Sequence, residues 1–144
     1  MIYKIALFLH VLSAVVATGP LFAIFPMLER MKSADGVLEQ GIIEGLRGAV
    51  RAVSLAGHLL VPTGIILLLF GGWPWNTPWV LATIIMLLAS LLFLAKAFKP
   101  AWYIAEAAHF DKRLFIRTMR SATIKYILIM IVMLWLMVAK PQLW

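Results

Sequence analysis

Two histidines inside long apolar stretches are the residues whose type and position most clearly suggest chemistry. His10 lies within YKIALFLHVLSAVVATGPLF (residues 3–22), and His58 lies within RAVSLAGHLLVPTGIILLLF (residues 51–70). An ionisable ring is costly inside a membrane, so such a residue usually faces the protein interior and often marks a functional site. Neutral imidazole ligates metals and heme iron, and helix bundles present it from facing helices. Each ring therefore predicts either metal or heme ligation or a buried interhelical hydrogen bond, which is worth about 1 kcal/mol.

The second stretch carries a polar face that includes His58. Four residues recur at spacings of three, four and four, namely Arg51, Ser54, His58 and Pro62. Residues at these spacings lie on one side of a helix. Pro62 cannot donate a backbone hydrogen bond and displaces the carbonyl of His58, so a free acceptor and an imidazole lie together. We predict that His58 is a cofactor ligand and that Arg51 binds a heme propionate or a lipid headgroup near the inner face.

Depth in the membrane argues against one heme shared by both rings. At a rise of about 1.5 Å per residue, His10 lies roughly 8 Å from the outer edge of its stretch and His58 roughly 9 Å from the inner edge of its own. Across a core about 30 Å thick, their heights differ by about 13 Å. Ligation by His10 together with a methionine, or by each histidine at its own heme, fits better. We predict His10 as an axial ligand and His58 as a second or independent ligand.

Several other chemistries lack the residues they need. The chain has no cysteine, which excludes disulfides, iron–sulfur clusters and thiolate catalysis. It has no Gly-rich phosphate loop after a strand, no suggested Ser/His/Asp set and no zinc-like spacing of histidines and carboxylates. Copper stays open, because methionine thioethers together with imidazole suit Cu(I).

The elements that must position these residues are four apolar helices. Hydrophobic residues make up 64% of the 144-residue chain and charged residues only 13%, a balance typical of a protein solvated by lipid. Stretches long enough to cross a bilayer lie at about residues 5–28, 52–71, 79–98 and 121–139. The sequence therefore predicts an all-α integral membrane protein, a four-helix bundle in one transmembrane domain.

The charges predict the orientation of this bundle. All but Lys4 and Lys140 of the 13 Lys and Arg residues fall in or beside the two long connections between spans one and two and between spans three and four. The positive-inside rule then places both connections in the cytoplasm and both termini outside. Trp73, Trp75, Trp79 and Trp144 are expected at the outer interface, where aromatic rings anchor a helix. The partner we expect is the lipid bilayer, not nucleic acid, in a multi-pass protein of the bacterial inner membrane.

Two further helical pieces are expected on the inner side. Residues 29–51 contain a turn, SADG, followed by spaced apolar residues, which predicts a short amphipathic cytoplasmic helix between spans one and two. Pro100 follows the third span, and proline favours the first position of a helix. A second helical piece is therefore predicted to begin at Pro100.

Both ends of the chain resemble a known group. The opening ALFLHVLSAVVATGPLFAIF and the ending LWLMVAKPQLW resemble small four-helix bacterial membrane proteins of the CopD-like and HemJ-type group, and the chain is most similar to their uncharacterised relatives. HemJ-type proteins are protoporphyrinogen oxidases that bind heme b, and CopD-like domains are implicated in copper uptake. The resemblance carries over His10 as the first-span histidine and a heme ligand.

The residues and the resemblance together leave three functional interpretations. The first is a heme-b-binding membrane protein that supports electron transfer or porphyrin oxidation, with His10, His58 and Arg51 at the cofactor. The second is a non-catalytic membrane subunit or scaffold with structural histidines, and the third is a copper-permease-like protein. A membrane redox partner or quinone, and a homo-oligomer, stay open.

Overall fold

The computed structural model describes residues 1–141, and within that range its regular elements are all helices. They are α1 (Ile2–Met31), α2 (Val37–Phe70), α3 (Pro78–Ala97), α4 (Lys99–Ala105) and α5 (Lys112–Ala139). Four helical stretches are long and apolar enough to cross a membrane, with α3 and α4 together forming the third. The all-α architecture with four crossing helices is confirmed. The predicted place of Trp144 lies outside the described residues.

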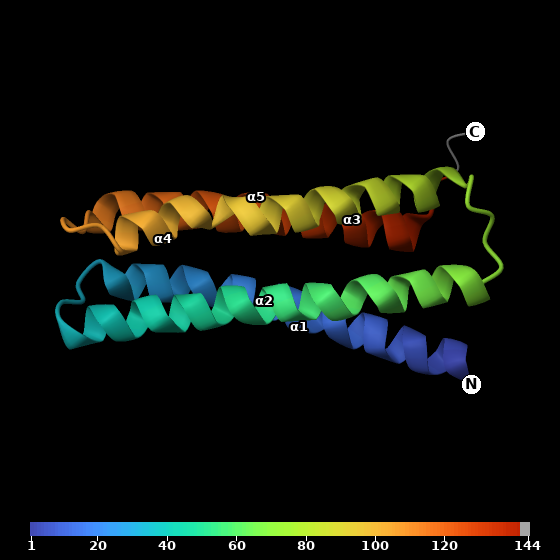
Figure 1. Ribbon diagram of the computed structural model, residues 1–144, viewed down its shortest axis with the longest axis horizontal. Helices are drawn as coiled ribbons and strands as arrows, with labels where there is room; N and C mark the ends of the chain where they lie inside the picture. The colour runs from blue at the N-terminus through green and yellow to red at the C-terminus, as the bar shows by residue number, and fades with distance from the viewer. Residues whose placement is uncertain (142–144) are drawn as a thin grey trace.

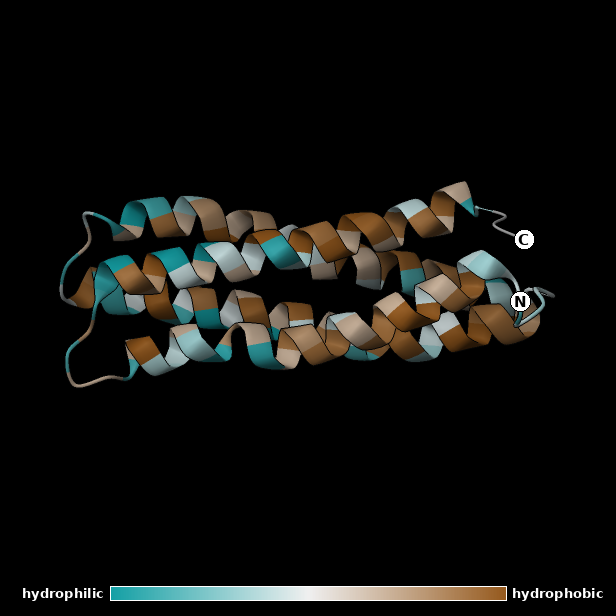
Figure 2. Ribbon diagram, turned by 90° about the horizontal axis from the view of Figure 1, so that it is seen from above, coloured by the Kyte–Doolittle hydropathy of each residue, from teal (hydrophilic) through white to brown (hydrophobic). Residues whose placement is uncertain are grey.

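The helices form two antiparallel pairs that lie side by side. Helices α1 and α2 make one pair, and α5 lies beside α3 and α4 in the other (Figure 1). The start of α1 and the end of α5 lie at one end of the bundle together with the loop of residues 71–77 (Figure 1). Hydrophilic residues gather at the opposite end (Figure 2). This arrangement agrees with the predicted even number of crossings, and the side of the membrane that each end faces stays a prediction.

The amphipathic segment between the first two spans is helical, but it is not the separate short helix that the sequence predicted. Helix α2 begins at Val37 and continues without interruption to Phe70. The segment contains no proline before Pro62, and Ile42 and Leu46 are buried along the line that Val53 continues, so one helix serves both parts. The expectation for Pro100 is confirmed, because α4 carries this proline in its first turn.

The best-packed part of the core lies toward the charged end. Its buried side chains come from all of the elements and include Leu21, Leu28, Leu46, Phe98 and Phe115. Helices α1 and α2 pack closely along their length, whereas α2 and α3 scarcely touch. This difference leaves a cleft between the two pairs on the side where α2 faces α3.

Aromatic residues pack together at the end of the bundle where α1 begins and α5 ends. The rings of Trp73 and Trp79 meet edge to face with centroids 5.3 Å apart. The Lys140 ammonium lies 4.7 Å from the Trp73 centroid and 5.6 Å from that of Trp79. Tryptophan faces attract cations. Lys140, which ends α5, thus holds this helix against the loop before α3.

Ion pairs join the two long connections at the charged end. The Lys112 ammonium lies 2.9 Å from Asp35 and 2.7 Å from Glu39, and it also donates to the carbonyl of Ala34. The Lys112 and Glu39 side chains are mostly buried. Lys112 therefore fixes the start of α5 to the turn between α1 and α2.

We expect Lys112→Met to lower the melting temperature of the detergent-solubilised protein by a few degrees, because the mostly buried Glu39 carboxylate loses its ion pair with Lys112. Lys99→Met is the matched control, since Lys99 is exposed and forms no ion pair among the described residues. Thermal unfolding followed by circular dichroism measures both variants. Equal melting temperatures for the two variants would show that the Lys112 contacts do not join the connections.

Candidate functional site: a lateral cleft between the helix pairs

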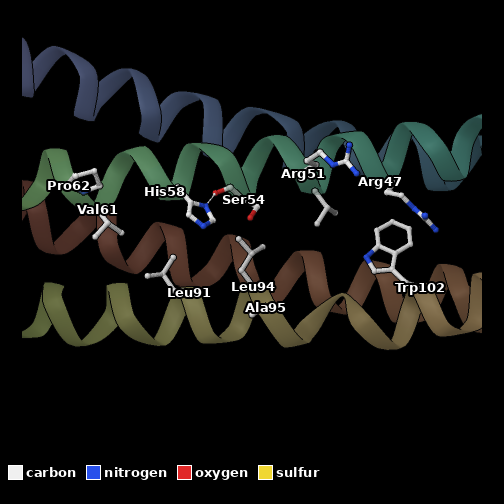
Figure 3. A pocket seen from close by; sticks show the side chains of 11 residues that line it. Arg47, Arg51, Ser54, His58, Val61, Pro62, Leu91, Leu94, Ala95 and Trp102 are labelled. Atoms are coloured by element: carbon white, nitrogen blue, oxygen red, sulfur yellow. Dashed lines mark hydrogen bonds between the residues drawn. The ribbon is translucent and has the colours of Figure 1, made fainter.

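The cleft between α2 and the α3–α4 segment has a volume of about 680 Å³. Its walls are mainly apolar, with Val61 on α2 facing Leu91 and Leu94 on α3 (Figure 3), and Pro62 also lines it. Its polar lining comes from Arg47, Arg51, Ser54, His58 and Trp102. Ligand sites in proteins are typically 300–1,000 Å³, mostly apolar and marked by a few polar groups. The cleft has this character.

His58 presents one ring nitrogen toward the cleft. Its Nδ1 lies 2.6 Å from the backbone carbonyl oxygen of Ser54, one turn earlier in α2 (Figure 3). A carbonyl can only accept, so Nδ1 carries the hydrogen and Nε2 carries the lone pair. This is the arrangement in which a histidine is oriented by its outer hydrogen bond and ligates through its other nitrogen. The His58 side chain lines the cleft and is exposed on the surface of the protein.

Two arginines lie at the end of the cleft nearer the charged connections. Arg47 pairs with Glu106 at 3.1 Å, and its guanidinium lies 5.3 Å from the centroid of the Trp102 ring. Arg51 lines the same cleft and has no carboxylate within ion-pair distance among the described residues. Seven residues separate Arg51 from His58, which is about 10 Å along a helix. The cleft therefore has one uncompensated cation about two helical turns from an available imidazole nitrogen.

His10 occupies a different environment, the tight interface between α1 and α2. Its side chain is only 8% exposed. Nδ1 lies 3.2 Å from the carbonyl oxygen of Leu60 and 3.1 Å from Oγ1 of Thr63. The Thr63 hydroxyl itself donates to the carbonyl of Leu59 at 2.8 Å, so its lone pair can accept from the imidazole. His10 thus makes the interhelical hydrogen bond that its burial requires.

A glycine on α2 allows this approach. A Cβ atom at Gly64 would lie 3.2 Å from Cε1 of His10 and 3.6 Å from Nδ1. Small residues at membrane-helix interfaces permit such close packing. The polar contacts of His10 and the missing side chain at Gly64 together fix the register of the α1–α2 pair.

The structure does not bring the two histidines to one site. His10 contacts α2 at Leu60 and Thr63, whereas His58 faces α3 across the cleft, and His10 does not line that cleft. The difference in height between the two histidines is smaller than the 13 Å predicted. His10 contacts Leu60 and Thr63, which follow His58 by two and five residues, and this spacing corresponds to about 3–8 Å along α2. The prediction was too large because α1 begins at Ile2 and not at residue 5, which moves His10 deeper.

The four residues predicted to share a face of α2 do so, since Arg51, Ser54, His58 and Pro62 all line the cleft. The sequence analysis missed Arg47, although it precedes Arg51 by four residues and continues the same face. It also missed Trp102, whose place depends on the packing of α4. Residues 1–141 contain no group of three or more histidines and carboxylates that could hold a metal ion.

Comparison with known proteins supports the membrane architecture. A family model described as a predicted integral membrane protein (DUF2269) matches residues 4–141. No curated protein and no solved structure gives a significant match. The match covers nearly the whole chain and shows a multi-pass integral membrane protein, which is a coarser result than the CopD-like and HemJ-type resemblance of the two ends.

Proposed function

We propose, from the premise that this chain belongs to the DUF2269 family of predicted integral membrane proteins, that it binds heme b in the lateral cleft. The observation that carries the proposal is the His58 imidazole, with Nδ1 bonded to the Ser54 carbonyl and Nε2 available to the cleft. Nε2 of His58 would be the axial ligand. We assign a structural role to His10, because its ring is buried between α1 and α2 and does not line the cleft.

The remaining lining suits a porphyrin. A porphyrin is an apolar plane with two carboxylates at one edge, and the cleft combines apolar walls with arginines at one end. Arg51 would pair with a propionate, and Arg47 would be a second partner beside Trp102. Burial against Leu91 and Leu94 would keep water from the ring face. Bound heme would supply one-electron chemistry, which the cleft tunes through its axial ligand and polarity.

The geometry supports electron transfer or porphyrin oxidation equally, since both need a heme that a membrane-soluble partner can approach. We place the protein in the bacterial inner membrane with both termini outside, because the cationic connections favour the cytoplasm. A quinone or another membrane redox protein would exchange electrons at the open side of the cleft. The scaffold interpretation is retained as the alternative, because the satisfied hydrogen bonds of His10 are those of a structural residue.

The test is the absorption spectrum of the protein purified from heme-supplemented cells. We expect a Soret band at one heme per chain that shifts on reduction with dithionite. A colourless protein that also fails to take up added hemin would overturn the proposal and favour the scaffold.

The role of Arg51 gives a graded prediction. Arg51→Gln should weaken heme retention by roughly ten- to a hundredfold, because one propionate loses a charged partner that is worth about 1.5–3 kcal/mol. The Soret position should stay the same, since the axial ligand is untouched. Lys96→Gln is the matched control, because Lys96 is exposed at the same end and does not line the cleft. Hemin titration of both variants decides, and equal affinities would remove Arg51 from the site.

A further inference from the structure

A second cleft lies at the charged end, between the start of α5 and the end of α1. It has a volume of about 800 Å³. Six basic residues line it: Lys32, Lys112, Arg113, Arg117, Arg120 and Lys125. Five of the six come from α5. It shares no lining residue with the cleft that contains His58.

The charges of this basic cleft are only partly neutralised by the protein. Lys32 and Arg120 both pair with Glu29, and Lys112 pairs with Asp35 and Glu39. The other three basic residues, Arg113, Arg117 and Lys125, have no carboxylate within ion-pair distance among residues 1–141. The cleft therefore carries an excess of positive charge that an anion from outside the chain can neutralise.

One buried donor also lacks a partner. Nε of Arg120 is inaccessible to water and makes no hydrogen bond within the described residues, although its NH2 group bonds to Glu29. Buried polar groups in native structures are nearly always paired, so an unpaired donor calls for a missing ligand or solvent atom. Because water does not reach this Nε, a phosphate oxygen would accept from it only after the Arg120 side chain turns toward the cleft.

The position of the cleft relates this anion to the membrane. Lys125 lies one turn inside the apolar span that begins near residue 121, so the cleft extends from the charged end into the apolar part of the bundle. Ile116 and Ile124 add apolar surface to the lining, and Ile124 is exposed. A ligand that fits both parts has an anionic phosphate and a hydrocarbon chain.

We propose that this basic cleft is a specific binding site for an anionic phospholipid. The phosphodiester lies near Arg113, Arg117, Arg120 and Lys125, and an acyl chain follows α5 past Ile124. Basic pockets between membrane helices on the cytoplasmic side bind anionic headgroups in this way. Each cation near the phosphate contributes about fivefold in affinity.

Native mass spectrometry of the purified full chain tests the site, with phosphatidylglycerol as probe and phosphatidylcholine of the same acyl chains as the zwitterionic comparison. We expect one phosphatidylglycerol to be retained in preference to phosphatidylcholine. Replacing Arg113, Arg117 and Lys125 together by Gln should weaken retention roughly a hundredfold. The matched control replaces Arg30, Lys96 and Lys99 by Gln, which removes the same charge at the same end from exposed residues outside the cleft.

Three outcomes would overturn the proposal. They are equal retention of the two lipids, an equal loss in the control triple variant, and displacement of the lipid by millimolar inorganic phosphate, which would indicate a site for free phosphate. The triple variant of the basic cleft should keep the Soret band of bound heme, because the two clefts share no lining residue. This test therefore fails or succeeds independently of heme binding.

Discussion

The His58→Ala variant should bind at least about tenfold less heme per chain, because the cleft then offers no imidazole to the iron. In the structure the Nδ1 atom of His58 is anchored on the Ser54 carbonyl, and Nε2 is the ring nitrogen left for a ligand. Addition of free imidazole to the purified variant should restore the Soret band, since the small molecule can enter the space left by the side chain. The measurement is the ratio of Soret to protein absorbance after hemin reconstitution.

The matched variant is His10→Ala. It removes a histidine of the same kind from a neighbouring helix, but His10 lies between α1 and α2 and does not line the cleft. We expect this variant to bind heme at the wild-type ratio while unfolding more easily. Loss of heme in His10→Ala with retention in His58→Ala would reverse our assignment of the ligand.

Gly64→Leu should destabilise the protein by about 1–3 kcal/mol, the usual cost of overpacking a filled interface. Even the first side-chain atom at this position would lie 3.2 Å from the His10 ring, whose Nδ1 hydrogen is shared between the Leu60 carbonyl and Oγ1 of Thr63. The measurement is unfolding of the detergent-solubilised chain by sodium dodecyl sulfate. Gly48→Leu is the control, because a Cβ atom there meets nothing within 4 Å.

The same interface predicts a strong coupling between two substitutions. In a His10→Ala background the space beside Gly64 opens, so Gly64→Leu should cost little or nothing. His10→Ala alone should cost about 1 kcal/mol for the interhelical hydrogen bond. Additive effects of the two substitutions would mean that the residues do not touch, because additivity is the behaviour of independent sites.

The architecture was largely predictable from the sequence. Hydropathy indicated the four spans, because a bilayer imposes a minimum apolar length on any helix that crosses it. The start of a new helix at Pro100 followed from local stereochemistry. The continuity of α2 did not, because a turn signal ends at Gly36 and nothing after it distinguishes a separate short helix from the first turns of a long one.

The candidate site was predictable only where it depends on one helix. The spacing of Arg51, Ser54 and His58 is enough to place these residues on one helical face, and Arg47 could have been found in the same way. Leu91 and Trp102 could not, since their place opposite α2 depends on how the two helix pairs pack. The contact of His10 with Thr63 likewise depends on how α1 and α2 are aligned along their length, which the sequence of one helix does not determine.

Electron paramagnetic resonance of the ferric, heme-loaded protein tests the central claim most directly, because the spin state of the iron reports its axial ligands. A single ligand from His58 in an open lateral cleft predicts an axial high-spin signal that disappears in His58→Ala. A low-spin signal typical of two histidine ligands, or one that persists without His58, would contradict the site described for this protein.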